Sequence, residues 1–337
     1  MRECILVTGG AGYIGSHTCK ALAKAGYVPI TFDDFSTGFH KVTKWGPVVV
    51  GDIRNVEAVT AALVKFRPVA AIHFAGKIAV GESVVEPALH YDANVIGTLS
   101  LLTALRGAGV DRVVFSSSAA VYGTPRSNFI AETHPIAPVN PYGRTKAMVE
   151  AILDDYRAAY GLRSIALRYF NASGADPDGE TGELHDPETH LIPLALAACE
   201  AEGSSLKIFG DDYPTPDGTC IRDYVHVSDL ADAHVVALGL LGAGDCPAAL
   251  NVGTGHGYSV AQVVETVETV TGHQVKREMA PRRSGDPAAL VADCTKLRQV
   301  SNWQPRRSDL STIVATAWQW HQRCRLSETK GVQNWRT

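Results

Sequence analysis

The chain has 337 residues, of which 45% are hydrophobic and 20% charged. This is the composition of an ordinary globular protein, long enough to bury a full core and to divide into one large and one smaller domain. The net charge is −4 and no run of Lys and Arg stands out, so the sequence indicates neither nucleic acid nor an anionic membrane as a partner.

The first predicted strand, Cys4–Val7, begins too early for a signal peptide to precede it. No stretch approaches the ~18 uninterrupted apolar residues of a membrane span. We therefore expect a cytoplasmic protein. The seven cysteines are scattered and lack the Cys-x-x-Cys or His spacing of a metal site, so we expect reduced thiols and no metal ligands.

Short apolar runs alternate with helix-length segments through the first half of the chain. Such continuous apolar strands, separated by helices, indicate a parallel sheet covered on both faces. The predicted fold class is therefore α/β, a doubly wound parallel Rossmann sheet. The predicted strands are Cys4–Val7, Val28–Phe32, Val48–Val50, Val69–Phe74, Val113–Phe115 and Ile165–Leu167.

Two long helices are predicted at 87–106 and 141–160. The second has Asn140 as its N-cap, Pro141 in its first turn and Gly161 as its stop signal. Either these helices pair with a second subunit, as in a homodimer, or they only cover the sheet.

After about residue 170 the sequence becomes rich in loops of Asp, Gly, Pro and Thr, with further helices predicted at 228–241 and 260–270. We expect residues 1–170 to form the first domain, with some later segments returning to it. Residues 171–337 are expected to form mainly a smaller C-terminal α/β domain that binds the substrate.

A glycine-rich segment, V-T-G-G-A-G-Y-I-G, joins the first predicted strand to a predicted helix. Gly9, Gly12 and Gly15 would let a pyrophosphate approach the backbone amides and the helix N-terminus, whereas a glycine triplet alone also occurs in simple tight turns. Asp33 ends the second strand, where a carboxylate accepts hydrogen bonds from an adenosine ribose and repels a 2′-phosphate. The context therefore predicts NAD rather than NADP.

Asp52-Ile53 follows the third strand. These two residues either border the adenine or simply begin a loop; spacing alone does not separate the two.

Tyr142 and Lys146, four residues apart, lie on one face of the predicted helix 141–160. A tyrosine titrates near ~10 and must lose about 3 units to act as a base around pH 7. An ammonium ~6 Å away supplies about two of these units at an effective dielectric of about 20. An oxidised nicotinamide would provide the further positive charge.

Ser116, Ser117 and Ser118 follow the strand Val113–Phe115, at the carboxyl end where doubly wound sheets bind ligands. With Tyr142 and Lys146 beside a dinucleotide loop, this chain resembles the extended short-chain dehydrogenase/reductase family over nearly its whole length. The resemblance implies that Tyr142 is the acid/base, that Lys146 lowers its pKa and holds the nicotinamide ribose, and that Ser118 hydrogen-bonds the reacting hydroxyl.

The same resemblance implies a set of cofactor contacts, among them Asn94, which matches the family's structural asparagine. The other expected NAD contacts are Gly9, Gly12, Tyr13, Ile14, Gly15, Asp33, Asp52, Ile53, Phe74, Ala75, Gly76, Ser116, Tyr142, Lys146 and Tyr169.

Ala119 and Ala120 stand where sugar-nucleotide dehydratases of the family carry an Asp-Glu pair and where decarboxylating members keep a Glu. Elimination of water needs an additional acid and base. A site with Tyr142 and Ser118 but no further acid can take a hydride from a carbinol and return it. Reversible epimerisation through a ketone requires no more than this.

Four further segments resemble the UDP-sugar epimerases of this family: His73–Ser83, Leu167–Asn171, Phe209–His234 and Ala280–Asp286. The resemblance implies reversible inversion at C4 of UDP-glucose and UDP-galactose with tightly bound NAD. Another NAD-dependent nucleotide-sugar oxidoreductase or dehydratase, and a non-catalytic NAD-binding module, are the alternatives.

By the same resemblance the diphosphate is bound by Asn171, Arg222 and Arg283, with cationic side chains suited to phosphate. Without the resemblance, an ion pair between Arg222 and the adjacent Asp223 would be an equally good interpretation. The remaining substrate contacts implied are Ser118, Tyr142, His190, Leu191, Lys207, Phe209, Asp286 and Leu290.

Some positions depart from the family pattern. Lys77 is displaced by one position, and His190 stands where Asn is frequent. Leu290 falls at the position that limits the sugar pocket, and its bulk argues against N-acetylated hexosamines. The segment Asp186–Pro193 also resembles enzymes acting on UDP-pentoses, so a UDP-xylose/UDP-arabinose 4-epimerase stays open.

His73 and His226 lie in apolar runs, where a hydrogen-bonded core histidine is commoner than a catalyst.

Overall fold

The computed structural model describes residues 2–127, 129–200, 204–243, 246–283 and 286–329. A seven-stranded sheet forms its larger part, with all neighbouring strands parallel in the order β12-β7-β5-β4-β1-β2-β3. This confirms the predicted doubly wound fold. The strands are β1 (Cys4–Thr8), β2 (Val28–Asp33), β3 (Val48–Val50), β4 (Ala70–His73), β5 (Arg112–Ser118), β7 (Arg163–Tyr169) and β12 (Ala249–Val252).

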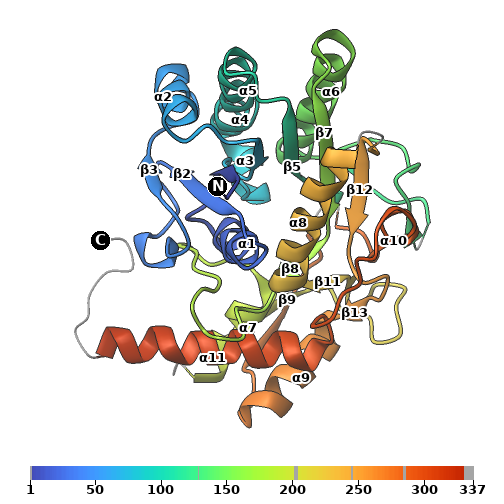
Figure 1. Cartoon of the computed structure of the whole chain (residues 1–337). Helices are drawn as coiled ribbons and strands as arrows, with labels where there is room; N and C mark the ends of the chain where they lie inside the picture. Colours follow the sequence, from blue (N-terminus) through green and yellow to red (C-terminus); the bar gives the residue numbers. More distant parts are fainter. Residues whose placement is uncertain (1, 128, 201–203, 244–245, 284–285, 330–337) are drawn as a thin grey trace.

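Helices cover both faces of this sheet (Figure 1). On one face, α1 (Tyr13–Lys24), α8 (Val227–Ala243) and α10 (Thr295–Val300) share a buried apolar cluster with the strands. On the other face the cluster includes α2 (Val56–Phe66), α5 (Gly97–Gly107) and α6 (Pro141–Tyr160). Because the strands are buried on both faces, they read as continuous apolar runs.

Helix α6 begins and ends where its sequence signals predict. The Asn140 side chain accepts a hydrogen bond from the Gly143 amide at 2.8 Å, and Pro141 occupies the first turn. Gly161 closes the helix in the left-handed conformation that glycine favours, at φ 70°.

The helix predicted at 87–106 is present as one continuous helical segment from Pro87 to Gly107, but it contains a π-helical turn. It consists of α4 (Pro87–Tyr91), a π-helical turn η2 (Asp92–Ile96) and α5, and it follows the short helix α3 (Val80–Val85). The π turn contains Asn94, which is buried and hydrogen-bonded across to other segments. Insertion of one residue into a helical turn is a local adjustment that apolar periodicity does not reveal.

The second part of the chain forms small sheets and a separate core. The sheets have the orders β13-β10-β15-β6, β11-β8 and β14-β9. Their strands are β6 (Phe129–Ile130), β8 (Asn171–Ser173), β9 (Leu206–Phe209), β10 (Ile221–Arg222), β11 (Tyr224–His226), β13 (Tyr258–Ser259), β14 (Arg277–Ala280) and β15 (Ala289–Ala292). The helices α7 (Leu191–Glu200), α9 (Val260–Thr271) and α11 (Leu310–Thr329) pack around the core, and short helical turns lie at η1 (His40–Val42) and η3 (Ala119–Tyr122).

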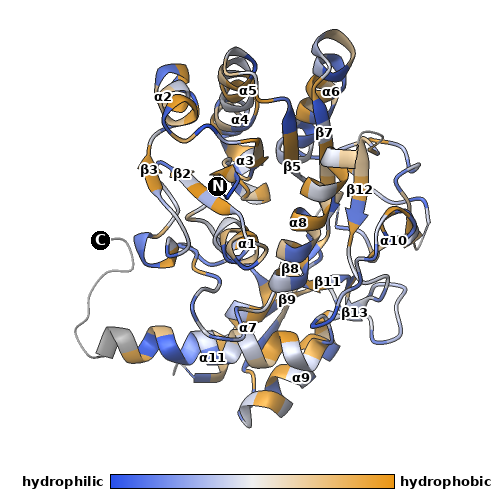
Figure 2. Ribbon diagram, in the orientation of Figure 1, coloured by the Kyte–Doolittle hydropathy of each residue, from blue (hydrophilic) through white to orange (hydrophobic). Residues whose placement is uncertain are grey.

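Figure 2 shows hydrophobic residues along much of α9 and hydrophilic residues toward the C-terminal end of α11. Among the described residues, no helix combines the length and the hydropathy needed to cross a bilayer. The seven cysteines, all in the described part of the chain, form no disulfide bond with one another.

Candidate active site

The glycine-rich loop fits tightly against the end of β4. Gly9 has φ 72°, and a Cβ atom there would lie 2.6 Å from the Ala75 amide nitrogen. A Cβ atom on Gly15 would lie 2.1 Å from the Gly9 carbonyl oxygen. Gly12 caps α1, whose first residue is Tyr13. The loop therefore presents bare backbone at a helix N-terminus, the arrangement that holds a pyrophosphate.

Asp33 lies at the end of β2 beside this loop. Its Oδ2 accepts a hydrogen bond from the Ala11 amide at 2.9 Å, and its Oδ1 accepts one from the Phe35 amide at 2.9 Å. Burial raises the pKa of Asp33, while these two amides oppose the rise. Each oxygen has a second lone pair, so the carboxylate can also accept bonds from ribose hydroxyls.

Asp52 and Ile53 play different parts in the structure. The Asp52 carboxylate accepts hydrogen bonds from the backbone amide and the side chain of Arg54, and the resulting ion pair lowers the pKa of Asp52. Ile53 is buried and packs against Gly97 at the start of α5. These contacts favour a structural role for Asp52.

Asn94 links the segment after β4 to α6. Its Oδ1 accepts a hydrogen bond from the Lys77 amide at 2.7 Å, and its Nδ2 donates to the Lys77 carbonyl at 3.0 Å and to Thr145 Oγ1 at 2.9 Å. Thr145 in turn donates to the Tyr142 carbonyl at 2.7 Å. The network fixes Lys77, next to the segment Phe74–Gly76 that follows β4, relative to the turn of α6 that carries Tyr142.

Ser118, Tyr142 and Lys146 come together where β5 ends. Burial raises the pKa of Tyr142, and a hydrogen bond between its phenol and the Ser118 hydroxyl offsets only part of that rise. Lys146 Nζ lies 5.7 Å from the centre of the Tyr142 ring and donates to the Ser116 carbonyl at 2.8 Å. Burial lowers the pKa of Lys146 to about 8.

This geometry changes the expected electrostatics of the pair. From the sequence, we assumed that the pKa of Tyr142 starts at its ordinary value and is then lowered by the Lys146 ammonium. Burial instead raises this starting pKa, because the phenolate is less favourable inside the protein than in water. Lys146 must therefore offset a desolvation penalty as well. A second positive charge at the site is needed more than the sequence alone indicated.

The three serines of β5 face different partners. Ser117 donates to Glu150, whose carboxylate forms an ion pair with Arg168 at 2.6 Å. Ser116 Oγ is hydrogen-bonded to the Tyr169 hydroxyl. Ser118 caps the turn η3 by accepting from the Ala120 amide at 3.1 Å. Only Ser118 interacts with Tyr142, so the structure separates it from its neighbours.

The expected substrate residues lie on the small sheets. Arg222 is 8% exposed and forms an ion pair with Asp286, so the alternative pairing with Asp223 is wrong. Asp223 instead accepts amide hydrogen bonds from Thr254 and Gly255 at 2.8 and 3.0 Å. Leu290 is the register partner of Arg222 across β10 and β15.

Leu290 also packs against the apolar cluster that contains Ala119, Val121 and Tyr122, and so it lies next to the turn after Ser118. A side chain at this place lies between the turn η3 and the strand that carries Arg222.

Further substrate candidates surround the end of β9. The Arg283 guanidinium lies 4.0 Å from the centre of the Phe209 ring. Lys207, on the same strand, is exposed, and Asn171 is exposed at the start of β8. Lys207 and Phe209 thus share β9, Asn171 begins β8, and Arg283 follows β14; no side-chain hydrogen bond joins these residues in the described part of the chain.

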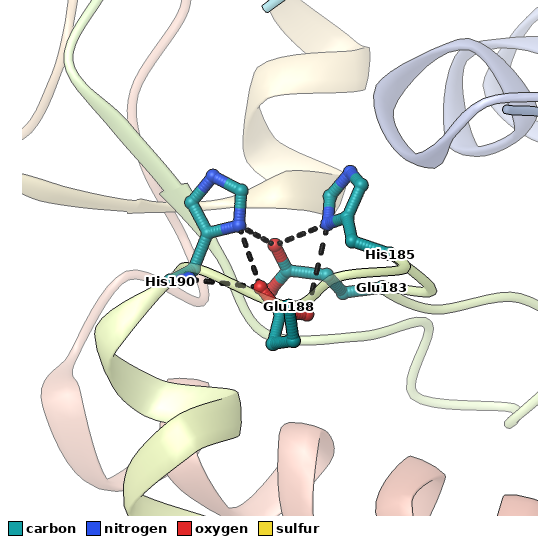
Figure 3. A group of neighbouring side chains, drawn as sticks. All are labelled: Glu183, His185, Glu188 and His190. Carbon is teal, nitrogen blue, oxygen red and sulfur yellow. Dashed lines mark hydrogen bonds and ion pairs between the residues drawn. The ribbon is translucent and has the colours of Figure 1, made fainter. Parts of the chain in front are cut away.

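His190 belongs to a compact cluster that the sequence analysis did not identify (Figure 3). Its Nδ1 lies 2.9 Å from carboxylate oxygens of both Glu183 and Glu188, and His185 faces the same two carboxylates. The carboxylates raise the pKa of His185 to about 9 and that of His190 to about 10. The spacing E-x-H-x-x-E-x-H could have revealed this cluster. Leu191 follows it as the first residue of α7.

Two histidines are core residues, as the sequence analysis favoured. His73 is hydrogen-bonded to Thr8 and Thr98 at 2.7 and 2.8 Å, and burial lowers its pKa to about 3. His226 is hydrogen-bonded to Thr316 at 3.1 Å and is fully buried. Tyr13 of the glycine-rich loop donates to the Gly174 carbonyl at 2.6 Å and so joins the first part of the chain to the second.

Comparison with known proteins places these features in a family. The NAD dependent epimerase/dehydratase family matches residues 5–253. A UDP-glucose 4-epimerase of Rhizobium meliloti is 51% identical over 319 residues, which cover 95% of this chain and 97% of the relative.

Solved structures agree closely with the fold. The UDP-glucose 4-epimerase of Brucella ovis in complex with NAD superposes with a TM-score of 0.92 at 50% identity, covering 95% of this chain and 98% of that one. The enzyme from Stenotrophomonas maltophila, with bound NAD and formylated UDP-arabinopyranose, gives 0.93 at 37% identity, covering 97% of this chain and 100% of that one.

Proposed function

The chain belongs to the NAD dependent epimerase/dehydratase family, and we propose that it interconverts UDP-glucose and UDP-galactose by reversible inversion at C4 with tightly bound NAD. The observation that carries this proposal is the set of Ser118, Tyr142 and Lys146 at the end of β5, beside the glycine-rich loop, in which Tyr142 and Lys146 are buried. Ala119 and Ala120 follow it and offer no acid for an elimination.

The residues of the loop suit the cofactor. The space around Gly9 and Gly15 is closed to any Cβ atom, which favours direct contact between backbone and phosphate. When bound, NAD accepts a hydride from C4 of the sugar and returns it. Asp33 would hold the ribose hydroxyls, and Lys146 would hold the nicotinamide ribose and stabilise the Tyr142 phenolate.

Tyr142 takes the proton from the 4-hydroxyl, directly or through Ser118, and returns it when the other epimer forms. Ser118 is placed to orient that hydroxyl because it already interacts with the phenol. Between the two transfers the 4-keto sugar turns within the pocket, so that its opposite face is reduced. The cycle is redox neutral, and so no outside oxidant is consumed.

We propose that the UDP moiety is bound by the small sheets, with Asn171, Arg222 and Arg283 at the diphosphate, Asp286 at the uridine ribose, and Lys207 and Phe209 at the uracil. The Arg222–Asp286 ion pair supports this assignment. It keeps the residue proposed for the diphosphate next to the residue proposed for the uridine ribose, and these two groups are neighbours in UDP. Residues 1–170 with returning segments would then bind NAD, and residues 171–337 mainly the UDP-sugar.

Substrate scope is tested by incubating the pure protein separately with UDP-galactose, UDP-N-acetylgalactosamine and UDP-xylose, without added NAD, and separating the products. We expect conversion of UDP-galactose. Conversion of the pentose alone would assign the protein to UDP-pentoses. Conversion of only the acetylated sugar would refute the proposed role of Leu290, and accumulation of NADH or a 4-keto-6-deoxy product would refute the epimerase assignment.

We also propose that the protein is a homodimer formed through α3, α4, η2 and α6. Apolar side chains on these segments are exposed: Val80, Val84, Val85, Leu89, Ile96 and Met148. Helices α3 and α4 both pack against α6, so these residues lie on neighbouring helices. A group of exposed apolar residues of this kind is typical of a protein–protein contact.

A further inference from the structure

The cluster of Glu183, His185, Glu188 and His190 lies in one short segment that leads into α7 (Figure 3). One donor atom from each of the four side chains can be chosen so that all four lie within 4.8 Å of one another. The His190 Nδ1 is 2.9 Å from Glu183 Oε1 and 2.9 Å from Glu188 Oε1, and the His185 Nδ1 is 3.2 Å from Glu183 Oε1.

We propose that these four side chains form a binding site for a single divalent transition-metal ion of the zinc type. Zinc bonds of about 2.0–2.2 Å to nitrogen and carboxylate oxygen require donor atoms about 3.4 Å apart in a tetrahedron. The distances from His185 Nδ1 and His190 Nδ1 to Glu183 Oε1, 3.2 and 2.9 Å, are slightly shorter than that value, and the two Glu188 oxygens lie 3.7 and 2.9 Å from the same nitrogens. Small side-chain shifts would complete the geometry.

The burial of the cluster supports a site rather than a surface charge pair. The Glu183 side chain is 8% exposed, and those of His185 and Glu188 are 18% and 21% exposed. Glu183 Oε1 and His185 Nδ1 are closed to solvent and lie 3.2 Å apart, and His190 Nδ1 lies 2.9 Å from the same oxygen. The donor atoms therefore face one another inside the protein rather than pointing into solvent.

The donor set selects the class of ion. Two imidazole nitrogens and two carboxylate oxygens suit zinc and its neighbours, whereas magnesium and calcium prefer oxygen ligands alone. Two carboxylates balance the charge of a divalent ion when both imidazoles are neutral.

A second group nearby provides an internal contrast. Asp176, Asp178 and Glu180 also bring carboxylates together, but the Lys20 ammonium lies 2.7, 2.7 and 2.8 Å from one oxygen of each. Lysine already balances this charge, and the donors are oxygen only. This group is therefore not the proposed site and can serve as a matched control.

The position of the cluster gives the ion a structural role. The Tyr13 ring of the glycine-rich loop packs edge-on against the His185 ring, with 6.3 Å between their centres. The segment continues into Leu191 of α7. A bound ion would fix this segment between the first and second parts of the molecule. The inference does not depend on the proposed reaction, because binding is measured without substrate.

The test uses the full-length protein, dialysed against a chelator and then titrated with Zn²⁺ by calorimetry, and with Co²⁺ by visible absorption. We expect one ion per chain and the intense cobalt bands of four-coordination. His185→Gln and Glu188→Gln should each weaken binding by more than about 100-fold, beyond the effect of losing an outer-shell partner.

Asp178→Asn, in the neighbouring group, should leave metal binding unchanged. Circular dichroism of each variant would establish that it is folded. The proposal is overturned if the wild-type protein binds no zinc, or if binding survives in His185→Gln and Glu188→Gln. Turnover of the chelator-treated wild type with UDP-galactose tests the proposed function separately, so the two can fail independently.

Discussion

Tyr142 lies in surroundings that oppose its ionisation. Burial raises its pKa, and the hydrogen bond with Ser118 offsets only part of the rise. The Lys146 ammonium, 5.7 Å from the ring centre, would favour the phenolate by about 3 kcal/mol at an effective dielectric of about 20. This is about two pKa units. The residue is therefore a base only when positive charges surround it.

Removal of the phenolic hydroxyl tests this role. We expect Tyr142→Phe to lower kcat by about 10²–10⁴-fold, the range for loss of a general acid/base, while UDP-sugar binding is retained. The measurement is turnover of UDP-galactose together with binding of UDP by calorimetry. Tyr160→Phe, on the same helix but 53% exposed, is the matched control and should keep normal turnover. Near-normal turnover of Tyr142→Phe would contradict the assignment.

Removal of the ammonium should change the pH dependence. Loss of about two pKa units of stabilisation predicts that, with NAD added, Lys146→Met turns over about 100-fold more slowly than the wild type at pH 7. Lys146 is charged below its own pKa of about 8, so the difference should be largest below pH 8 and should shrink above it.

The check is a kcat profile from pH 6 to 10. Lys65→Met, which removes a lysine 4.9 Å from the Phe66 ring on α2, is the control. Parallel profiles for the wild type and Lys146→Met would contradict the electrostatic role.

The sequence predicts some of these residues better than others, for a physical reason. Tyr142 and Lys146 are one helical turn apart, so their juxtaposition follows from periodicity. The Arg222–Asp286 ion pair joins residues 64 positions apart and depends on how β10 pairs with β15. The desolvation of Tyr142 likewise depends on packing, which the sequence does not contain.

At the scale of elements, the prediction that the protein binds NAD depends on one unit: β1, the glycine-rich loop and α1. Backbone atoms close to Gly9 and Gly15 leave no room for a side chain at either glycine. These atoms belong to the loop itself or to the segment that follows β4. The motif was therefore recognisable from sequence, while the close contact with Ala75 was not.

Substitution in this loop gives a sharp test. Gly15→Ala would place a Cβ atom 2.1 Å from the Gly9 carbonyl oxygen, so the loop must open and bound NAD should be lost. The measurement is the amount of NAD released from the purified, denatured protein. Gly239→Ala, in α8 with open space around it, should retain NAD and gain up to about 1 kcal/mol of stability. Full NAD retention in Gly15→Ala would contradict the proposed cradle.

The helical segment 87–107 shows what apolar periodicity cannot predict about a helix. The segment 87–106 has helical periodicity, but η2 replaces a regular turn around Asn94. The asparagine then reaches both Lys77 and Thr145. A tertiary hydrogen-bond network, rather than local propensity, determines this geometry.

At the scale of the molecule, the central sheet followed from six apolar runs, each of which became a strand. The seventh strand, β12, arrives from residues 249–252 and pairs with β7. Its pairing is long-range and could not be read from the sequence. The strands of the small sheets have only two to four residues, which is too short for a periodic pattern to be recognised in the sequence.

Oligomeric state tests the exposed apolar face. Val85→Glu, at a side chain 77% exposed on α3, should convert the predicted dimer to a monomer, because a buried unpaired charge is costly. Size-exclusion chromatography with light scattering measures the mass. Val64→Glu, 67% exposed on α2, is the control and should stay dimeric. A monomeric wild type, or a dimeric Val85→Glu, would contradict the proposed interface.

The central claim is that the hydride removed from C4 returns to C4 of the same sugar. The most direct measurement follows UDP-galactose labelled with deuterium at C4, incubated with the protein in ordinary water without added NAD, by mass spectrometry and NMR of the products. We expect an equilibrium mixture with UDP-glucose in which the deuterium stays at C4. Loss of the label to solvent, or accumulation of a keto product with reduced cofactor, would contradict it.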